Sequence, residues 1–376
     1  MPTSFSDKTN QLPNKDMHST GHRESNLELY RILLMLAIVA HHYVVNSGLW
    51  AECISKEPTI GRSIFLLLFG AWGKTGINCF LMITGYFMCQ SHISLKKFIK
   101  LLFEIEFYKI IIFIIFFVTG NTTCSLGSLR ALLPVSTITN DFVSCFLIFF
   151  LFIPFLNLFI QDLSKRNYHK LLLFLLVFYT LLPSFGIAIA FNYVTWFSVV
   201  YLIAAYIRLH PVPAFSNCRF WFISSVVCFF ASCASILGFA FGFRKGVYWF
   251  LADSNKILAV ATAISFFLFF KNIKLKYNPI INLFAQSVFG VLLIHANSDA
   301  MRQWLWIDTL QNKRFFDSPW LVLHAFGSVI GVYLICTAID QIRIHLIENP
   351  FFNRFGNTFD RIQTKLINTI GISSHV

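Results

Sequence analysis

The feature that most constrains this chain is a series of ten mostly apolar stretches of about 20 residues, the length with which an α-helix crosses a bilayer. Short polar connections separate them, and only 12% of the 376 residues are charged, against about 25% in soluble domains. We therefore predict an all-α polytopic membrane protein with about ten transmembrane helices. The predicted spans are 27–46, 63–89, 98–119, 142–161, 169–187, 190–208, 219–241, 253–270, 280–297 and 320–342.

Composition divides the chain into three parts. Residues 1–26 form a polar leader without a cleavable secretory signal, so we expect the first span to remain in the membrane. Residues 27–348 form the membrane domain. Residues 349–376 form a tail whose apolar residues recur at helical spacing, which fits either an amphipathic helix on the inner membrane surface or a solvated tail.

The basic residues indicate the orientation. If the N-terminus is cytoplasmic, eighteen of the 30 Lys and Arg residues fall on the cytoplasmic side, nine on the other side and three within spans. Cytoplasmic loops carry the excess of Lys and Arg in membrane proteins, so both termini are predicted to be cytoplasmic. The same rule explains the net charge of +13, and nucleic-acid binding is not expected.

Three spans have unusual boundaries. Span 63–89 carries four glycines and is predicted to be broken or re-entrant, which a membrane tolerates only where protein or water covers the backbone. Spans 169–187 and 190–208 have almost no connection between them and are predicted to form a tight hairpin. The residues behind these predictions are Gly70, Gly73, Gly76 and Gly85 in the first case and Pro183, Ser184 and Gly186 in the second.

The nine cysteines indicate packing rather than metal binding. Most lie in or beside apolar spans, and none has the spacing of a metal-binding pair, so no metal site is expected. Cys53 and Cys124 lie in predicted outward loops, which leaves a disulfide between them open.

The first span contains two ionisable residues that lipid would make costly, Arg31 and His42. Eleven residues place them on one helix face, about 16 Å apart. His42 could act as a general base at neutral pH or could be a structural hydrogen-bonding residue. Arg31 could bind phosphates, or could pair with Glu28 three residues earlier. The neighbouring His41 points about 100° away and is predicted to be structural.

Two further spans carry charged groups. Lys74, with Asn78 one turn later on the same face, adds a second intramembrane cation, which favours an anion site over a lysine that only extends towards the interface. In the third span, Glu106 and Lys109 are three residues apart and are predicted to form a structural ion pair.

The ninth span contains Ser287 in its first half, and His295, Asn297 and Asp299 lie at its outer end. Ser287 and His295 are about 80° apart around the helix, so they do not form a nucleophile–base pair, although Ser287 could donate a hydrogen bond within a cavity. The polar outer end is followed by two tryptophans. This combination fits a carbohydrate site or an ordinary interfacial aromatic belt.

Three motifs together resemble acyltransferase family 3, the integral-membrane O-acyltransferases. They are Arg31 followed by ten residues and His42, the segment from Gly73-Lys74 to Gly85-Tyr86, and Ser287-x-x-Gly290-x-x-x-Ile294-His295. The resemblance covers residues 24–348. It implies transfer of an acyl group other than an aminoacyl group, with acetyl expected. The expected donor is cytoplasmic acetyl-CoA or another acyl-CoA, and the expected acceptor is a hydroxyl of a surface polysaccharide or lipid-linked glycan. A bacterial cell membrane is the expected location.

By that resemblance, His42 would be catalytic, and Arg31 and Lys74 would bind the donor. Glu28, Asn78, Ser287, His295 and Asp299 are candidate cavity or acceptor contacts. Acyl-CoA would be a co-substrate, and no permanently bound cofactor or metal is expected. His42 could act as a general base or carry the acyl group covalently. The alternative function for intramembrane charges is a glycan transporter, flippase or exporter.

Overall fold

The computed structural model describes residues 24–91, 93–136 and 141–370, and within these ranges all regular structure is helical. The longest helices are α1 (Ser25–Val45), α5 (Leu95–Val118), α7 (Phe142–Gln161), α11 (Cys218–Gly242), α16 (Leu321–Arg343) and α17 (Asn349–Ile370). The medium ones are α4 (Gly73–Met88), α8 (Lys165–Leu176), α10 (Tyr193–Leu209) and α12 (Ile257–Asn272).

Short elements complete or connect the long ones. They are α2 (Leu49–Lys56), α3 (Gly61–Phe69), α6 (Leu126–Ala131), α9 (Leu182–Ser184), α13 (Pro279–Gln286), α14 (Val288–His295) and α15 (Asp299–Arg302). The π-helical segments are η1 (Val177–Leu181), η3 (Gln303–Thr309) and η5 (Ile344–Glu348). The 3-10 segments are η2 (Pro213–Ser216) and η4 (Asn312–Phe315).

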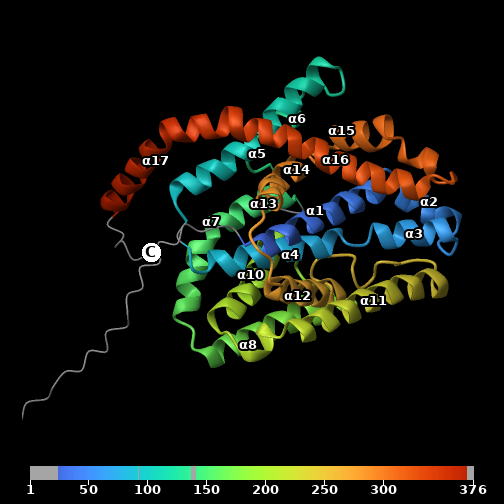
Figure 1. Ribbon diagram of the computed structural model, residues 1–376, viewed down its shortest axis with the longest axis horizontal. Coiled ribbons are helices and arrows are strands. Elements are labelled where there is room, and N and C mark those ends of the chain that lie inside the picture. The colour runs from blue at the N-terminus through green and yellow to red at the C-terminus, as the bar shows by residue number, and fades with distance from the viewer. Residues whose placement is uncertain (1–23, 92, 137–140, 371–376) are drawn as a thin grey trace, which may run out of the picture.

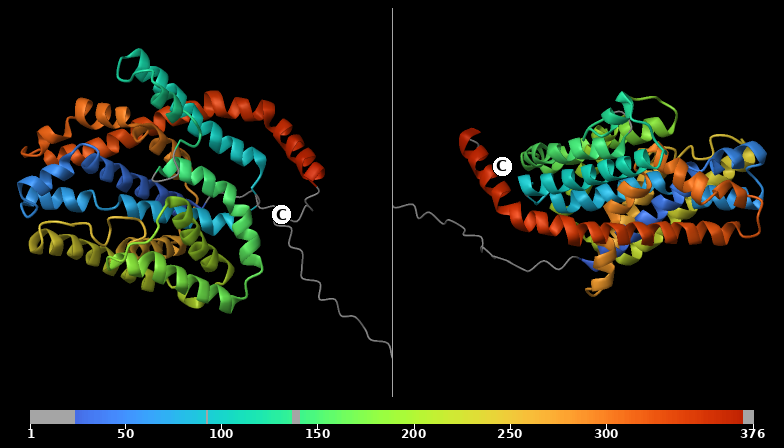
Figure 2. Two further views of the ribbon diagram at one scale, coloured as in Figure 1. Left: turned by 180° about the vertical axis from the view of Figure 1, so that it is seen from behind. Right: turned by 90° about the horizontal axis from the view of Figure 1, so that it is seen from above.

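The helices form one bundle around α1 and α4. Figure 1 shows these two helices in the middle, with α11 and α12 along one side and α16 along the other. Helix α1 packs against α4, α13, α14 and α16, and α4 also packs against α10 and α12. In Figure 2, α17 continues from α16 along a bent path beside α5, and the two helices are in contact. The central position of α1 places its polar residues inside the protein.

Polar side chains cap the beginning of eight of the described helices. In a helix, the first backbone N–H groups have no partner within the helix, and a residue before the first turn accepts hydrogen bonds from them. The capping residues whose side chains accept such bonds are Ser94, Ser125, Asp141, Ser164, Asn192, Asn217, Asn278 and Ser298. At these positions the sequence therefore marks where a helix begins.

Five helical segments of the described chain are long and apolar enough to cross a membrane, and a bent pair raises the number to six. The bent pair is 279–295 with 299–315, which meet at 96°. Helices α10 and α12 are apolar but shorter, and α5 carries several charges. Each of the ten predicted spans falls largely on helix, but the count of ten, the three-part division and the cytoplasmic termini stay predictions.

Several local predictions can be compared with the structure. The break in span 63–89 is confirmed, because α3 ends at Phe69 and α4 begins at Gly73. The tight connection predicted between spans 169–187 and 190–208 is wrong, since helix ends at Ser184 and resumes only at Tyr193, although α8 and α10 do contact each other. The Cys53–Cys124 disulfide is also wrong, because both thiols are free, with Cys53 buried and Cys124 exposed.

The tail contains the predicted helix. Helix α17 is amphipathic and contacts α5 and η5. The backbone N–H of Leu95 donates to the side-chain oxygen of Gln363 at 2.9 Å, which ties the start of α5 to α17. A position of this helix on the membrane surface stays a prediction.

Candidate active site

Two histidines from distant parts of the chain meet inside the bundle. His42, near the end of α1, has its Nδ1 atom 2.9 Å from Nε2 of His295, the last residue of α14. Nδ1 of His295 lies 2.6 Å from the backbone carbonyl of Val291, one turn earlier on the same helix. His295 is completely buried. The pair therefore links α1 to α14 and is fixed at one end by a backbone group.

The carbonyl of Val291 determines which nitrogens carry protons. A carbonyl oxygen only accepts hydrogen bonds, so Nδ1 of His295 must donate. In neutral His295, Nε2 then has a lone pair and accepts from Nδ1–H of His42. Neutral His42 consequently keeps a lone pair on Nε2. This chain of hydrogen bonds leaves one basic nitrogen on His42, the one that the pair does not use.

His41 has a different environment from its neighbour. Its Nδ1 atom lies 2.6 Å from the carbonyl oxygen of Gly70, in the break between α3 and α4. The first residue of α4 packs against the same ring, because a Cβ atom on Gly73 would lie 2.3 Å from Cγ of His41. The broken span thus accommodates His41, as the structural role predicted for it requires.

Lys74 lies beside Gly73 and reaches across to α10. Its ammonium donates to the hydroxyl of Tyr193 at 2.6 Å and lies 3.6 Å from Oδ1 of Asp253. One turn later, Asn78 donates to the backbone carbonyl of Ser254 at 2.6 Å. Together these two side chains hold the segment before α12 against α4.

Arg31 and Glu28 form the ion pair that their spacing permits. Nη1 of Arg31 lies 3.0 Å from Oε2 of Glu28, and the two side chains are 26% and 12% exposed. The local pairing interpretation of Arg31 is thus present in the structure. The pair still offers a partly exposed guanidinium about 16 Å from His42 along α1.

The remaining predicted residues lie elsewhere. Ser287, at the junction of α13 and α14, accepts a hydrogen bond from Nε2 of Gln341 at 2.8 Å and does not contact His295. Asp299 is 98% exposed and pairs with Arg302 at 2.7 Å. The structure therefore brings only His295, of the three ninth-span candidates, to His42.

The Glu106–Lys109 ion pair predicted within α5 is wrong. The ammonium of Lys109 donates to the backbone carbonyl of Leu133 at 2.8 Å. One oxygen of Glu106 is buried without a hydrogen-bond partner. The chain after α5 folds back and offers Lys109 an acceptor that helical spacing alone cannot reveal.

A buried ionic cluster, which the sequence analysis missed, supports α14 from the other side. Arg343, only 3% exposed, contacts the carboxylates of Glu104, Asp340 and Glu348. The Asp340 carboxylate also accepts from the hydroxyl of Tyr108 at 2.7 Å. The i, i+3 spacing of Asp340 and Arg343 at the end of an apolar run is the sequence feature that could have indicated this cluster.

This cluster touches the helix of His295 at a glycine. A Cβ atom on Gly290 would lie 2.3 Å from Cγ and Oδ1 of Asp340. Only glycine permits this approach of α14 to α16, as small residues do at helix contacts in membranes. The position of His295 therefore depends on a contact five residues before it.

Aromatic side chains cover the histidine pair on the side of η3. The ring of Trp306, fully buried, lies 6.3 Å from that of His295 and 6.1 Å from that of Tyr43. The hydroxyl of Tyr43 lies 2.8 Å from Nδ1 of His324 on α16. Sequence analysis assigned no role to His324, because nothing in its own segment indicates that Tyr43 is its partner.

The arrangement suits proton transfer more than metal binding. Within the described ranges, no group of three or more His, Cys, Asp or Glu side chains could hold a metal ion. His42 offers one basic nitrogen, and Lys74 lies in the helix that packs against His41. A base with cations nearby can deprotonate a hydroxyl and stabilise an anionic substrate.

Comparison with known proteins adds a family to this geometry. A family model described as an acyltransferase domain matches residues 24–340. The match begins one residue before α1 and ends within α16, so it contains His42, Lys74 and His295. No curated protein and no solved structure matches the chain.

Proposed function

Since this chain belongs to acyltransferase family 3, we propose that it transfers an acetyl group from cytoplasmic acetyl-CoA to a hydroxyl of a cell-surface polysaccharide or lipid-linked glycan. The chain is a membrane acyltransferase by family. The donor, the acceptor and the location in a bacterial cell membrane belong to the proposal.

The hydrogen-bond chain from Val291 through His295 to His42 is the observation that supports this proposal. In the reaction, Nε2 of His42 takes the proton from the acceptor hydroxyl while its oxygen attacks the thioester carbonyl. Nδ1–H of His42 keeps its bond to His295 throughout. The lone pair of His295 thereby orients His42 and stabilises the imidazolium that forms, and the fixed ring needs no reorganisation.

The second half of the step returns the proton. The tetrahedral intermediate collapses, the bond between carbonyl carbon and sulfur breaks, and the leaving thiolate takes the proton from Nε2 of His42. The products are the acetyl ester and free coenzyme A, with His42 neutral again. The same nitrogen would carry the acetyl group in a covalent relay, and trapping of an acetylated His42 distinguishes that route.

One cation on α1, Arg31, and one on α4, Lys74, fit an anionic donor. Coenzyme A carries several phosphate charges, and guanidinium and ammonium groups bind phosphates. Arg31 lies in the half of α1 that is predicted to face the cytoplasm, where the donor exists, and Lys74 lies nearer the histidines. We assign both to donor binding, with Glu28 and Tyr193 as the partners that hold them in place.

The test is deletion of the gene in its host followed by proton NMR of purified surface glycans. O-acetyl signals should vanish, return with the wild-type gene and stay absent with His42→Ala at equal membrane abundance. Unchanged acetyl signals together with loss of glycan from the surface would refute acyl transfer and favour a transporter or exporter.

A further inference from the structure

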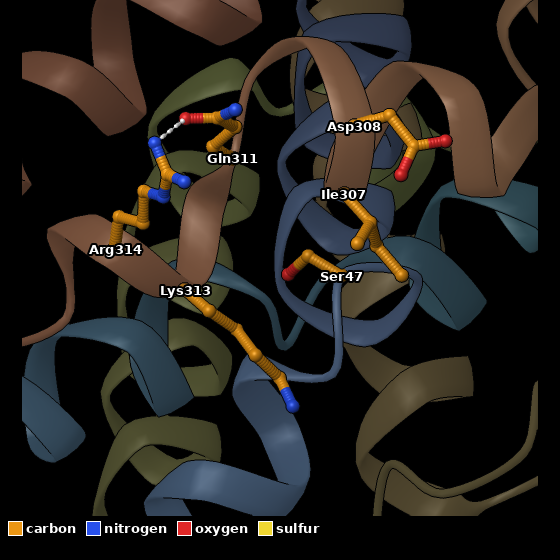
Figure 3. A pocket seen from close by; sticks show the side chains of 6 residues that line it. All are labelled: Ser47, Ile307, Asp308, Gln311, Lys313 and Arg314. Atoms are coloured by element: carbon orange, nitrogen blue, oxygen red, sulfur yellow. Dashed lines mark hydrogen bonds between the residues drawn. The ribbon is translucent and has the colours of Figure 1, made fainter.

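A pocket of about 440 Å³ opens beside the end of α1 that carries His42. Its volume lies within the range of about 300–1,000 Å³ that small-molecule sites occupy. The lining is Ser47 from the turn after α1 and Ile307, Asp308, Gln311, Lys313 and Arg314 from η3, η4 and the turn between them. Figure 3 shows these side chains around the space between the two parts of the chain.

We propose that this pocket binds an anionic sugar residue of the acceptor glycan, next to the residue whose hydroxyl is acylated. The inference rests on the proposed function and adds the chemical class of the acceptor. A glycan is a chain of sugars, so one residue can be held in a subsite while its neighbour reaches the base.

The charges of the pocket favour an acid group. Lys313 and Arg314 both line it, and within the described part of the chain no carboxylate pairs with either of them. The one carboxylate in the lining, Asp308, accepts a hydrogen bond from the amide of Gln303 at 3.2 Å. The surplus is therefore positive, and charge-assisted hydrogen bonds from Lys and Arg are the strong ones available to a carboxylate or phosphate.

The turn that carries these cations is held in a defined conformation by hydrogen bonds and burial. Gln311 has a φ of 52°, in the left-handed region that a residue with a side chain rarely adopts. Its side-chain oxygen accepts from Nη1 of Arg314 at 2.6 Å, which Figure 3 shows as a dashed line. The next residue, Asn312, is fully buried. Strained turns that the surrounding structure enforces concentrate at binding sites.

The pocket is tied to the helical turn of His42. The carbonyl of Tyr43 accepts hydrogen bonds from Ser47 at 2.6 Å and from Asn312 at 3.0 Å. Trp306, adjacent in sequence to the pocket residue Ile307, lies against the rings of Tyr43 and His295. Ser47 lies in the turn directly after α1, five residues beyond His42 in the sequence. The pocket and the histidine pair are thus connected through Tyr43 and Trp306 at the same end of α1.

The experiment measures binding without acyl-CoA, on the full chain in phosphatidylcholine nanodiscs. Isothermal titration compares three trisaccharides that differ at one position, with a carboxylate, a phosphate ester or the reduced hydroxymethyl group. At low salt, at least one acidic form should bind about fivefold more tightly than the reduced form. Equal affinities of all three forms would overturn the proposal.

Variants test whether the preference comes from this pocket. Lys313→Gln should lose the preference, and Lys313→Arg should retain it. Lys245→Gln, at an exposed lysine after α11, is the matched control and should also retain it. A preference for the acidic trisaccharide that survives Lys313→Gln would overturn the assignment. Loss of the preference in wild type when phosphatidylglycerol is added to the nanodisc would also overturn it, because the pocket would then be assigned to a lipid headgroup.

The test of the pocket and the test of the catalytic role of His42 can fail independently of each other. If the acidic glycan binds selectively while His42→Ala still transfers acetyl groups, the pocket stands and the catalytic role fails. If His42→Ala abolishes transfer while the three trisaccharides bind equally, the pocket assignment fails and the catalytic role stands.

Discussion

Replacing Gly290 by alanine should disrupt the contact that positions His295. The added Cβ would lie 2.3 Å from Cγ and Oδ1 of Asp340, whereas carbon atoms pack at about 3.5–4.0 Å. More than an ångström of movement is therefore needed. Asp340 is completely buried, and Oδ1 is held by Tyr108 at 2.7 Å and by Arg343 at 2.9 Å. The side chain cannot turn away without losing these bonds, so α14 must move from α16.

The size of the effect follows from the two ways of relieving this clash. Overpacking a core costs about 1–3 kcal/mol, and breaking a buried ion pair costs about 3–5 kcal/mol. Gly290→Ala should therefore lower the free energy of unfolding by about 3 kcal/mol. Because α14 ends at His295, acyl transfer should fall as well, and a displacement of about 1 Å can reduce a rate about 100-fold.

The assay is thermal unfolding of the protein in nanodiscs together with the rate of acyl transfer. Gly327→Ala on α16 is the matched control, because nothing lies within 4 Å of its added Cβ, and it should change stability by less than about 1 kcal/mol. In an Asp340→Ala background the clash disappears, so Gly290→Ala should then cost little. Equal effects of Gly290→Ala in both backgrounds would refute the steric argument.

Three further predictions address the site and the end of the bundle at which α2 and η4 lie. His295→Ala removes the acceptor for Nδ1–H of His42 and should lower kcat about tenfold at unchanged KM for acetyl-CoA. His295→Gln should recover part of the lost kcat, and a change confined to KM would contradict a positioning role. Lys74→Met should raise the KM for acetyl-CoA about tenfold, whereas Tyr193→Phe, which keeps the cation, should change this KM less than threefold. Equal effects of the two variants on KM would contradict recognition of the donor by charge. The ammonium of Lys56, the last residue of α2, donates to Asp317 just after η4 and lowers the pKa of that carboxyl. The stabilising contribution of this pair is present above the unfolded-state pKa of about 4 and is lost as the pH falls through the lower folded-state value. Asp317→Asn should therefore remove this acid step from the pH dependence of thermal stability, and an unchanged profile would contradict the assignment.

Sequence could predict the parts of the site that depend on local spacing. Helical periodicity is sufficient to place Glu28 beside Arg31 and to separate His41 from His42, because both relations lie within one helix. The glycines of span 63–89 predict a break for the same local reason. The link between His42 and His295 joins positions 253 residues apart, and no periodicity within either helix encodes it.

The ionisable groups that sequence misplaced or missed have one physical origin in common, which is partners supplied by other segments. Loop charge gives no sign that Arg343 is buried, but three carboxylates from α5, α16 and η5 compensate its charge and allow burial. Lys109 should pair with Glu106 by spacing, yet the backbone of Leu133 is within reach. The charges that make α5 a poor membrane span by composition include Glu104, which contacts Arg343. Tertiary contacts of this kind determine which ionisable groups a membrane bundle can contain.

The most direct test of the central claim is the rate of acetyl transfer from labelled acetyl-CoA by His42→Asn in nanodiscs. The asparagine amide can replace Nδ1–H and keep the bond to His295, but it has nothing at the position of Nε2. A base at Nε2 predicts a loss of about 100-fold or more, with His41→Asn close to the wild-type rate. Wild-type transfer by His42→Asn would contradict the account, since His42 would then only support the fold.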